Sequence, residues 1–290
     1  MPCPPKLTAA LALAALVPAC AQFSGRHALE HTRTLVSFGP RPPGSPGMKK
    51  AQDHIVKHLK AHGWQVREDD FTARTPAGPM AMKNIIAFRP GSSGKAVAVT
   101  GHYDTKIFPF RFVGANDGGS SAGFLLEMAR ALRDVPLKNS VYLVFFDGEE
   151  AVREWTAEDS LYGSRRLAAQ WQRDRTLSTL AALINVDMIG DRDLRIVREQ
   201  YSADTLMRLI WSVARQLGLA ERFSGPALAI EDDHVPFLRL GVRAANLIDF
   251  DYGPDHSWWH TKEDTLDKLS PDSFEAVGRV LIEVLKRLDG

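Results

Sequence analysis

Cysteine is almost absent from this chain of 290 residues, since it occurs only at Cys3 and Cys20. Without these two, the rest of the chain has no thiolate for metal binding or nucleophilic attack and no pair for an internal disulfide. An excess of charge of one sign is also missing, because 36 Lys and Arg balance 35 Asp and Glu. This balance gives no sign of a nucleic-acid partner. No repeat, low-complexity tract or Gly/Ser linker divides the chain, so residues 22–290 are expected to form one catalytic domain.

The first residues are typical of an export signal. A short basic start precedes the apolar stretch Leu7–Ala19, which is too short to anchor the chain across a bilayer. We expect residues 1–21 to be a bacterial-type signal peptide whose removal releases a periplasmic or secreted product. The alternative is a lipoprotein site at Val17–Cys20, with anchoring through Cys20.

Short apolar runs alternate with helical patterns along the rest of the chain. This alternation predicts an α/β fold, a three-layer sandwich whose mixed, largely parallel central sheet is flanked by helices. The expected strands are Asn84–Phe88, Ala96–Thr100, Val141–Phe146, Leu183–Met188 and Ala245–Phe250. The expected helices are Met48–Gly63, Ser120–Leu132, Leu161–Arg173, Asp204–Leu217 and Phe274–Leu288. The Pro- and Gly-rich stretch Phe38–Gly47 is expected to be a rigid surface loop near the site and not a helix.

Acidic residues and histidines gather at or after the expected strand ends, where ligands bind in open α/β sheets. Four such segments, all before residue 190, are Glu149–Glu150, His102–Asp104, Asn116–Gly118 and Asn185–Asp187. A fifth segment, Trp259–Thr261, follows later in the chain. Where thiolate is absent, zinc is held by histidine nitrogen and carboxylate oxygen. Asp117, Glu150 and His260 supply three such ligands and leave a fourth position for substrate or water, and Glu149 would carry protons. The residues predict a zinc hydrolase or transferase.

The motifs around these residues resemble peptidase family M28 in its broad sense, and within it the animal-type zinc glutaminyl cyclases. The broad resemblance runs from Leu29–Thr34 to Trp259–Thr261. The narrower one rests chiefly on Asp159–Arg165 and Asp232–Leu238. Aminopeptidases of the family do not usually carry these two blocks.

This resemblance implies a glutaminyl-peptide cyclotransferase, which converts N-terminal Gln, and slowly Glu, of peptides and proteins to pyroglutamate with release of ammonia. It also implies three kinds of site residue. They are the zinc ligands Asp117, Glu150 and His260, the catalytic acids Glu149, Asp187 and Asp232, and the pocket aromatics Trp155 and Trp259. One zinc ion per chain, peptide substrates and a monomer are expected.

Two features depart from the animal enzymes. The segment Asp249–Trp258 is longer and more acidic than the corresponding loop, so the resemblance does not define this wall of the pocket. The animal enzymes also carry a disulfide near the site, and this chain cannot form it. Neither change removes a catalytic residue.

His102 and Asp187 leave a second interpretation open. In the dizinc aminopeptidases of the family, the corresponding residues bind a second zinc ion that shares Asp117. In the cyclase interpretation His102 and Asp187 make hydrogen bonds instead, and Asp104 orients His102. A non-catalytic binding domain is a third alternative, but such a domain need not keep every ligand and acid.

A stripe of three histidines, His54, His58 and His62, lies one helical turn apart within Met48–Gly63. The segment lacks the glutamate of a zincin helix, so we expect the stripe to be solvated and not to bind metal.

Overall fold

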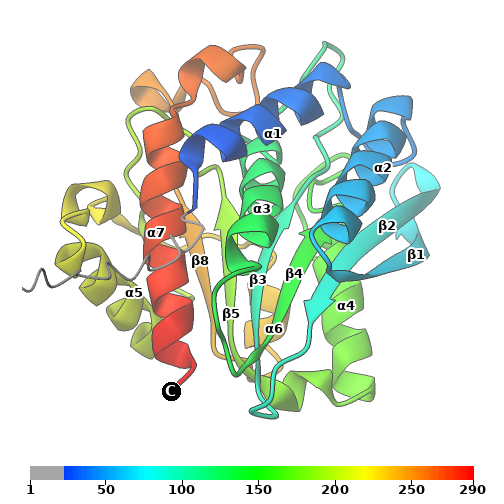
Figure 1. Ribbon diagram of the computed structural model, residues 1–290. Coiled ribbons are helices and arrows are strands. Elements are labelled where there is room, and N and C mark those ends of the chain that lie inside the picture. Colours follow the sequence, from blue (N-terminus) through cyan, green and yellow to red (C-terminus); the bar gives the residue numbers. More distant parts are fainter. Residues whose placement is uncertain (1–22) are drawn as a thin grey trace, which may run out of the picture.

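The computed structural model describes residues 23–290 (Figure 1). The expected signal segment 1–21, with Cys3 and Cys20, lies outside the described residues, so its cleavage and lipidation stay predictions. Within residues 23–290, no helix has the length and apolar character needed to cross a membrane.

A six-stranded sheet in the order β1-β2-β4-β3-β5-β8 forms the middle layer. Its strands are β1 (Gln65–Thr75), β2 (Gly78–Arg89), β3 (Ala96–His102), β4 (Ser140–Phe146), β5 (Leu180–Asp187) and β8 (Ala244–Ile248). Strands β4, β3, β5 and β8 run parallel, whereas β1 and β2 form an antiparallel hairpin at one edge. A separate two-stranded sheet pairs β6 (Arg198–Glu199) with β7 (Ala227–Leu228).

Alternate residues of the central strands face two different layers, as the period of two in a strand requires. Val97 and Val99 of β3 belong to the larger hydrophobic cluster, and Ala98 belongs to the smaller one. The larger cluster includes residues of α1 (Gly25–Ser37), α2 (Pro46–Ala61), α3 (Gly119–Leu132), α5 (Asp204–Gln216) and α7 (Pro271–Leu288). The smaller cluster includes residues of α4 (Tyr162–Arg173) and α6 (Val235–Leu238). The predicted three-layer sandwich is confirmed.

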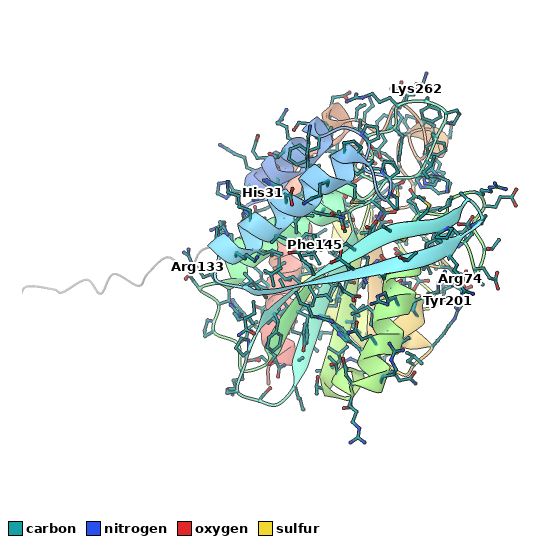
Figure 2. All side chains as sticks on the ribbon, turned by 90° about the vertical axis from the view of Figure 1, so that its right-hand side faces the viewer. His31, Arg74, Arg133, Phe145, Tyr201 and Lys262 are labelled. Carbon is teal, nitrogen blue, oxygen red and sulfur yellow. The ribbon has the colours of Figure 1, made fainter. Side chains whose placement is uncertain are left out.

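The hairpin at the sheet edge was only partly predicted. The expected strand Asn84–Phe88 is the end of the longer β2, and β1 was not expected at all. Most β1 residues are at least partly exposed, so the strand lacks the apolar run by which buried strands are recognised. Figure 2 shows the hairpin facing the viewer, with Arg74 near its turn.

The expected loop Phe38–Gly47 needs two corrections. Its last two residues belong to α2, which begins at Pro46 after the N-cap Ser45. A helix tolerates proline in its first turn because the missing N–H has no partner there. The loop is also not purely a surface element, because Arg41 is fully buried.

Candidate active site

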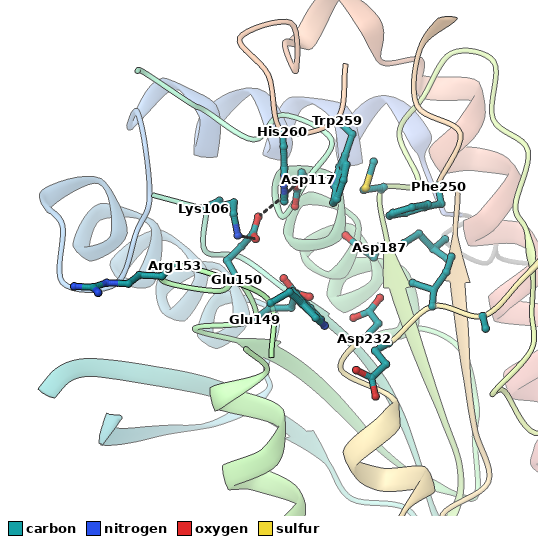
Figure 3. Close-up of a pocket in the computed structure, with 16 residues that line it drawn as sticks. Lys106, Asp117, Glu149, Glu150, Arg153, Asp187, Asp232, Phe250, Trp259 and His260 are labelled. Atoms are coloured by element: carbon teal, nitrogen blue, oxygen red, sulfur yellow. Dashed lines mark hydrogen bonds and ion pairs between the residues drawn. The ribbon is translucent and has the colours of Figure 1, made fainter. Parts of the chain in front are cut away.

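The predicted site residues meet at the carboxyl ends of β3, β4 and β5 (Figure 3). His102 is the last residue of β3, and Asp187 is the last residue of β5. Glu149 and Glu150 follow β4, and Asp117 lies just before α3. Parallel strands bring these positions to one edge of the sheet, although they are far apart in the sequence.

Asp117, Glu150 and His260 form a group whose ligand atoms all lie within 4.8 Å of one another. His260 Nε2 lies 3.1 Å from Glu150 Oε1 and 3.2 Å from Asp117 Oδ2. The contact to Asp117 Oδ2 lacks hydrogen-bond geometry, and this buried oxygen has no hydrogen-bond partner among residues 23–290. A buried carboxylate oxygen without a donor is costly unless a cation meets it. One imidazole nitrogen and two carboxylates therefore fit a zinc ion with an open position.

His260 is held in an unusual conformation. Its φ of 55° lies in the left-handed region, which residues with a side chain rarely adopt outside functional sites. The Trp259 ring stacks on its imidazole with centroids 4.0 Å apart, and Phe108 meets it edge-on at 5.4 Å. These contacts turn Nε2 toward the two carboxylates.

His102, Asp117 and Asp187 form a second group of possible metal ligands within 4.8 Å. His102 Nε2 lies 3.1 Å from Asp187 Oδ1 and 3.3 Å from Asp117 Oδ1. His102 Nδ1 lies 3.3 Å from Asp104 Oδ1. Asp104 therefore lies where a residue that orients His102 is expected. Burial opposes a charge on His102, but Asp187 and Glu149 raise its pKa well above the usual value. A protonated His102 donates hydrogen bonds, as the cyclase interpretation requires, whereas a neutral His102 could bind a second zinc ion through Nε2. The distances alone fit both interpretations of the group.

Glu149 is buried beside other acids. Burial and the charges of Glu150 and Asp232 raise the pKa of the Glu149 carboxyl well above its usual range, although His102 opposes this shift. Burial, then Asp187, raises the pKa of Asp232 to about 6. Carboxyl groups with raised pKa values are suited to moving protons near neutral pH.

Two aspartates hold the ligand-bearing loops through their backbone N–H groups. Asp104 accepts hydrogen bonds from the N–H groups of Glu149 and Glu150, both at 3.2 Å. Asp264 accepts from the N–H groups of Asn116 and Asp117, at 2.7 and 3.2 Å. Asp264 was not among the residues predicted from the sequence, because its backbone partners carry no sequence signal.

Arg41 is a second residue that the sequence analysis missed. Its buried guanidinium donates to the backbone carbonyls of Tyr103, Val113 and Gly114, at 2.9, 2.7 and 3.0 Å. Burial lowers the pKa of Arg41 to about 10, so the side chain stays charged at neutral pH. It ties the loop before α2 to the segments that follow β3 and precede Asp117.

The acidic side chains of the site line a cavity of about 450 Å³. Its wall also includes Lys106, Arg153, Trp155, Met188, Ala229, Ile230, Glu231, Ile248, Phe250 and Trp259. Trp155 is 41% exposed and Trp259 lies beside His260 (Figure 3). Both predicted pocket aromatics thus line the cavity that contains the acids.

The segment Asp249–Trp258, whose course the resemblance left undefined, contributes one wall through Phe250. Asp249 does not line the cavity, and it accepts hydrogen bonds from the N–H groups of Arg195 and Asp251, at 2.7 and 3.3 Å. Tyr252 donates to Asp264 Oδ1 at 2.9 Å. The acidic character of the segment therefore serves loop structure more than the cavity.

The histidine stripe is not simply solvated as expected. His58 is half-buried, and its ring lies 4.4 Å from that of His31 on α1 and 4.2 Å from that of His62. Among residues 23–290, the only groups of three with metal-ligand geometry are the two at the strand ends. The stripe packs α1 against α2, a contact that a single-helix pattern does not reveal.

Comparison with known proteins assigns the chain to a family. The model of peptidase family M28 matches residues 84–285, the greater part of the chain. The chain belongs to peptidase family M28. The broad resemblance that the motifs predicted is confirmed.

Several of the proteins to which the chain is similar are glutaminyl cyclases. The chain is 31% identical over 279 residues to a glutaminyl-peptide cyclotransferase-like protein of Bos taurus, covering 83% of this chain and 70% of the bovine protein. A glutaminyl cyclase from an Acidobacteriales bacterium is 39% identical with a TM-score of 0.90, covering 98% of this chain and 99% of that one. A Zn-dependent exopeptidase from Parabacteroides distasonis is 27% identical with a TM-score of 0.83, covering 92% and 99%. Together with the donor set of the site, these relatives support a zinc cofactor.

Proposed function

We propose that this protein is a zinc-dependent glutaminyl-peptide cyclotransferase acting on N-terminal Gln, and more slowly Glu, of peptides and proteins. The observation that carries the proposal is the place of Asp232, an acid that lines the cavity in addition to Glu149 and Asp187. The side-chain amides of Asn185 and Asn246 donate to its carboxylate at 3.0 and 2.7 Å. Activating a water molecule needs one base, whereas cyclisation must also orient the substrate's own amine.

One zinc ion is assigned to Asp117, Glu150 and His260. When bound, zinc supplies a Lewis acid that polarises the γ-carbonyl of the substrate glutamine. Asp117 and Glu150 are buried, and His260 is fixed by the Trp259 ring. These residues therefore offer a preformed set of donors.

Glu149 is assigned the proton transfers. The α-amine nitrogen of the substrate attacks its γ-carbonyl carbon, so the C–N bond of the lactam forms and the C–N bond to the amide nitrogen breaks. Glu149 takes a proton from the amine and gives it to the leaving nitrogen, which departs as ammonia. Asp187 and Asp232 orient the amine and the carboxyl of Glu149. No water is consumed, and the two reacting groups already belong to one residue.

The aromatic wall is assigned to substrate binding. Trp259 and Phe250 lie with ring centroids 5.1 Å apart beside the acids, and Trp155 stands at the cavity mouth with 41% exposure. Apolar walls of this kind exclude water from the reacting groups and surround the side chain of the first residue.

A dizinc aminopeptidase is the second candidate. The observation that favours it is the group His102, Asp117 and Asp187, whose ligand atoms lie within 4.8 Å. With two zinc ions, Glu149 would activate a water molecule and the products would be a free amino acid and a shortened peptide.

Mass spectrometry of peptide products separates the two candidates. A cyclotransferase lowers the mass of Gln-initiated peptides by one ammonia and leaves Leu-initiated peptides intact. The rate should rise from mildly acidic to slightly alkaline pH, because the substrate amine, with a pKa of about 8, must lose its proton. Release of free Leu from a peptide panel, with Gln peptides uncyclised, would refute the proposal and establish the aminopeptidase.

Export of residues 22–290 as a single catalytic domain is proposed from the leader pattern. Cleavage after Ala21 would leave Gln22 as the new N-terminus. The exported enzyme would then carry an N-terminal residue of the kind that it acts on. Mass spectrometry of the N-terminus should find pyroglutamate at position 22, whereas a lipidated Cys20 would establish the membrane-anchored alternative.

A further inference from the structure

Glu199, the last residue of β6, is a buried carboxylate that does not line the cavity. Its Oε1 accepts hydrogen bonds from the N–H groups of Tyr201 and Ile230, at 2.9 and 3.1 Å. Its Oε2 accepts from the N–H and hydroxyl of Ser202, both at 2.7 Å. His234 Nε2 lies 3.1 Å from the same oxygen and donates to it, because an ionised carboxylate only accepts.

Two of these partners, Ile230 and His234, lie on either side of Asp232 in the chain. The residues Ala229, Ile230, Glu231 and Asp232 line the cavity consecutively. Glu199 accepts a hydrogen bond from the backbone N–H of Ile230, two residues before Asp232. It accepts another from the side chain of His234, two residues after Asp232. One buried side chain therefore holds the loop that carries the Asp232 carboxylate on both sides of this residue.

A second chain of hydrogen bonds joins Glu199 to Asp232. The Ser202 hydroxyl, which donates to Glu199, accepts from the N–H of Asn246 at 2.9 Å. The Asn246 side-chain amide donates to Asp232 Oδ2 at 2.7 Å. Glu199 is thus linked directly to the loop that carries Asp232 and, through Ser202, to the strand that supplies its amide donor.

Keeping a carboxylate charged in this location is costly unless enough donors meet it. Burial acts against the charge, but the hydrogen bonds from His234, Tyr201 and Ser202 lower the pKa of Glu199 to about 2. The side chain is therefore ionised at any working pH, and its five donors are all committed to the same geometry.

We propose that Glu199 is a positioning residue for the cyclisation reaction, which sets the place of the Asp232 carboxylate through Ile230, Ser202 and His234. The inference rests on the proposed function of Asp232. Glu199 touches neither substrate nor zinc ligands, and it acts by fixing the loop 229–234 against β8.

The test compares zinc-loaded full-length Glu199→Gln with wild type on a Gln-initiated peptide, measuring ammonia release. The amide of Gln puts an NH2 group, which only donates, in the place of one carboxylate oxygen that accepts from several donors, so the loop should shift. We expect kcat to fall on the order of 10- to 100-fold, with KM changed much less and zinc content unchanged. Glu127→Gln is the matched control, because Glu127 is equally buried and accepts from Arg130 and the N–H of Ser24 far from the cavity lining.

A double-mutant cycle separates positioning from a general loss of stability. In an Asp232→Asn background, Glu199→Gln should have little further effect on kcat, because the carboxylate that it places is already absent. A normal kcat for Glu199→Gln, or losses that multiply independently in the double variant, would overturn the inference. If Asp232→Asn alone keeps normal turnover, the proposed role of Asp232 fails instead.

A milder variant keeps the test decisive if Glu199→Gln does not fold. Ser202→Ala removes one donor to Glu199 and the acceptor for the Asn246 N–H. We expect a smaller fall in kcat with the same dependence on Asp232. A wild-type kcat for Ser202→Ala together with a misfolded Glu199→Gln would assign Glu199 to stability alone and contradict the proposal.

Discussion

Asp264 and Asp117 are 147 residues apart in the chain, yet the carboxylate of Asp264 accepts the backbone N–H of Asp117 at 3.2 Å. Asp264 lies four residues after His260, so one short segment carries a proposed zinc ligand and holds the backbone of another. The position of Asp117 relative to His260 is thereby fixed before a metal binds.

Asp264→Asn should weaken zinc binding. The amide oxygen of asparagine can accept a hydrogen bond from one of the two backbone N–H groups, those of Asn116 and Asp117. The NH2 group of the amide would face the other N–H group, which loses its acceptor. We expect the zinc Kd, measured by chelator competition, to rise on the order of 10- to 100-fold, as for other residues that orient metal ligands. Asp267→Asn, an exposed neighbour, is the control and should bind zinc normally. Unchanged zinc affinity of Asp264→Asn would show that the loop is held by other contacts.

Glu149→Gln should keep the fold and the zinc but lose most turnover. The amide cannot cycle a proton, and general acid–base groups contribute about 10²–10⁴-fold. The measurement is kcat for ammonia release at matched zinc content. Glu154→Gln tests an exposed acid of the same loop and should resemble wild type. Near-normal turnover of Glu149→Gln would remove this residue from the mechanism.

The purified enzyme should contain about one zinc ion per chain by elemental analysis, and Glu150→Ala should lose both the metal and the activity, because each ligand of a three-residue site is needed. His102→Ala should retain the zinc. Two tightly held zinc ions, one of which is lost in His102→Ala, would instead support the dizinc peptidase.

Stability should fall at acid pH through the histidines between α1 and α2. Burial, then neighbouring imidazoles, lowers the pKa of His31 to about 3 and that of His58 to about 4. The unfolded chain, with histidine pKa values of about 6.5, binds protons that the folded chain cannot, so stability is full above pH 6.5 and declines toward pH 4.

Thermal unfolding between pH 7 and pH 4.5 checks this prediction. His31→Phe keeps a ring against His58 but cannot be protonated, so its Tm should fall less than that of wild type over this range. His27→Phe, at a mostly exposed position of the same helix, should follow wild type. Parallel Tm curves for all three proteins would contradict the prediction. Loss of zinc at low pH affects all three equally.

The location of the site was predictable from the sequence for a physical reason. His102 and Asp187 lie at the ends of short, apolar, β-branched runs that indicate buried strands, and the ends of parallel strands meet. Asp264 and Glu199 were not predictable, because they act on backbone N–H groups, which every residue except proline has. Their partners become visible only when the chain is folded.

The hairpin strand β1 and the packing of His58 on His31 escaped prediction for a different reason. β1 shows little burial along its length, so its pairing with β2 depends on the backbone more than on an apolar pattern. The contact of His58 with His31 joins two helices, and a periodicity within one helix says nothing about its neighbour.

The buried guanidinium of Arg41 has a practical consequence for handling the enzyme. It joins segments near the site by hydrogen bonds to carbonyl oxygens, and residues 23–290 contain no cysteine. These links are insensitive to thiols. The catalytic domain should refold from urea with equal yield in the presence or absence of dithiothreitol, and production in a reducing cytoplasm should give active enzyme.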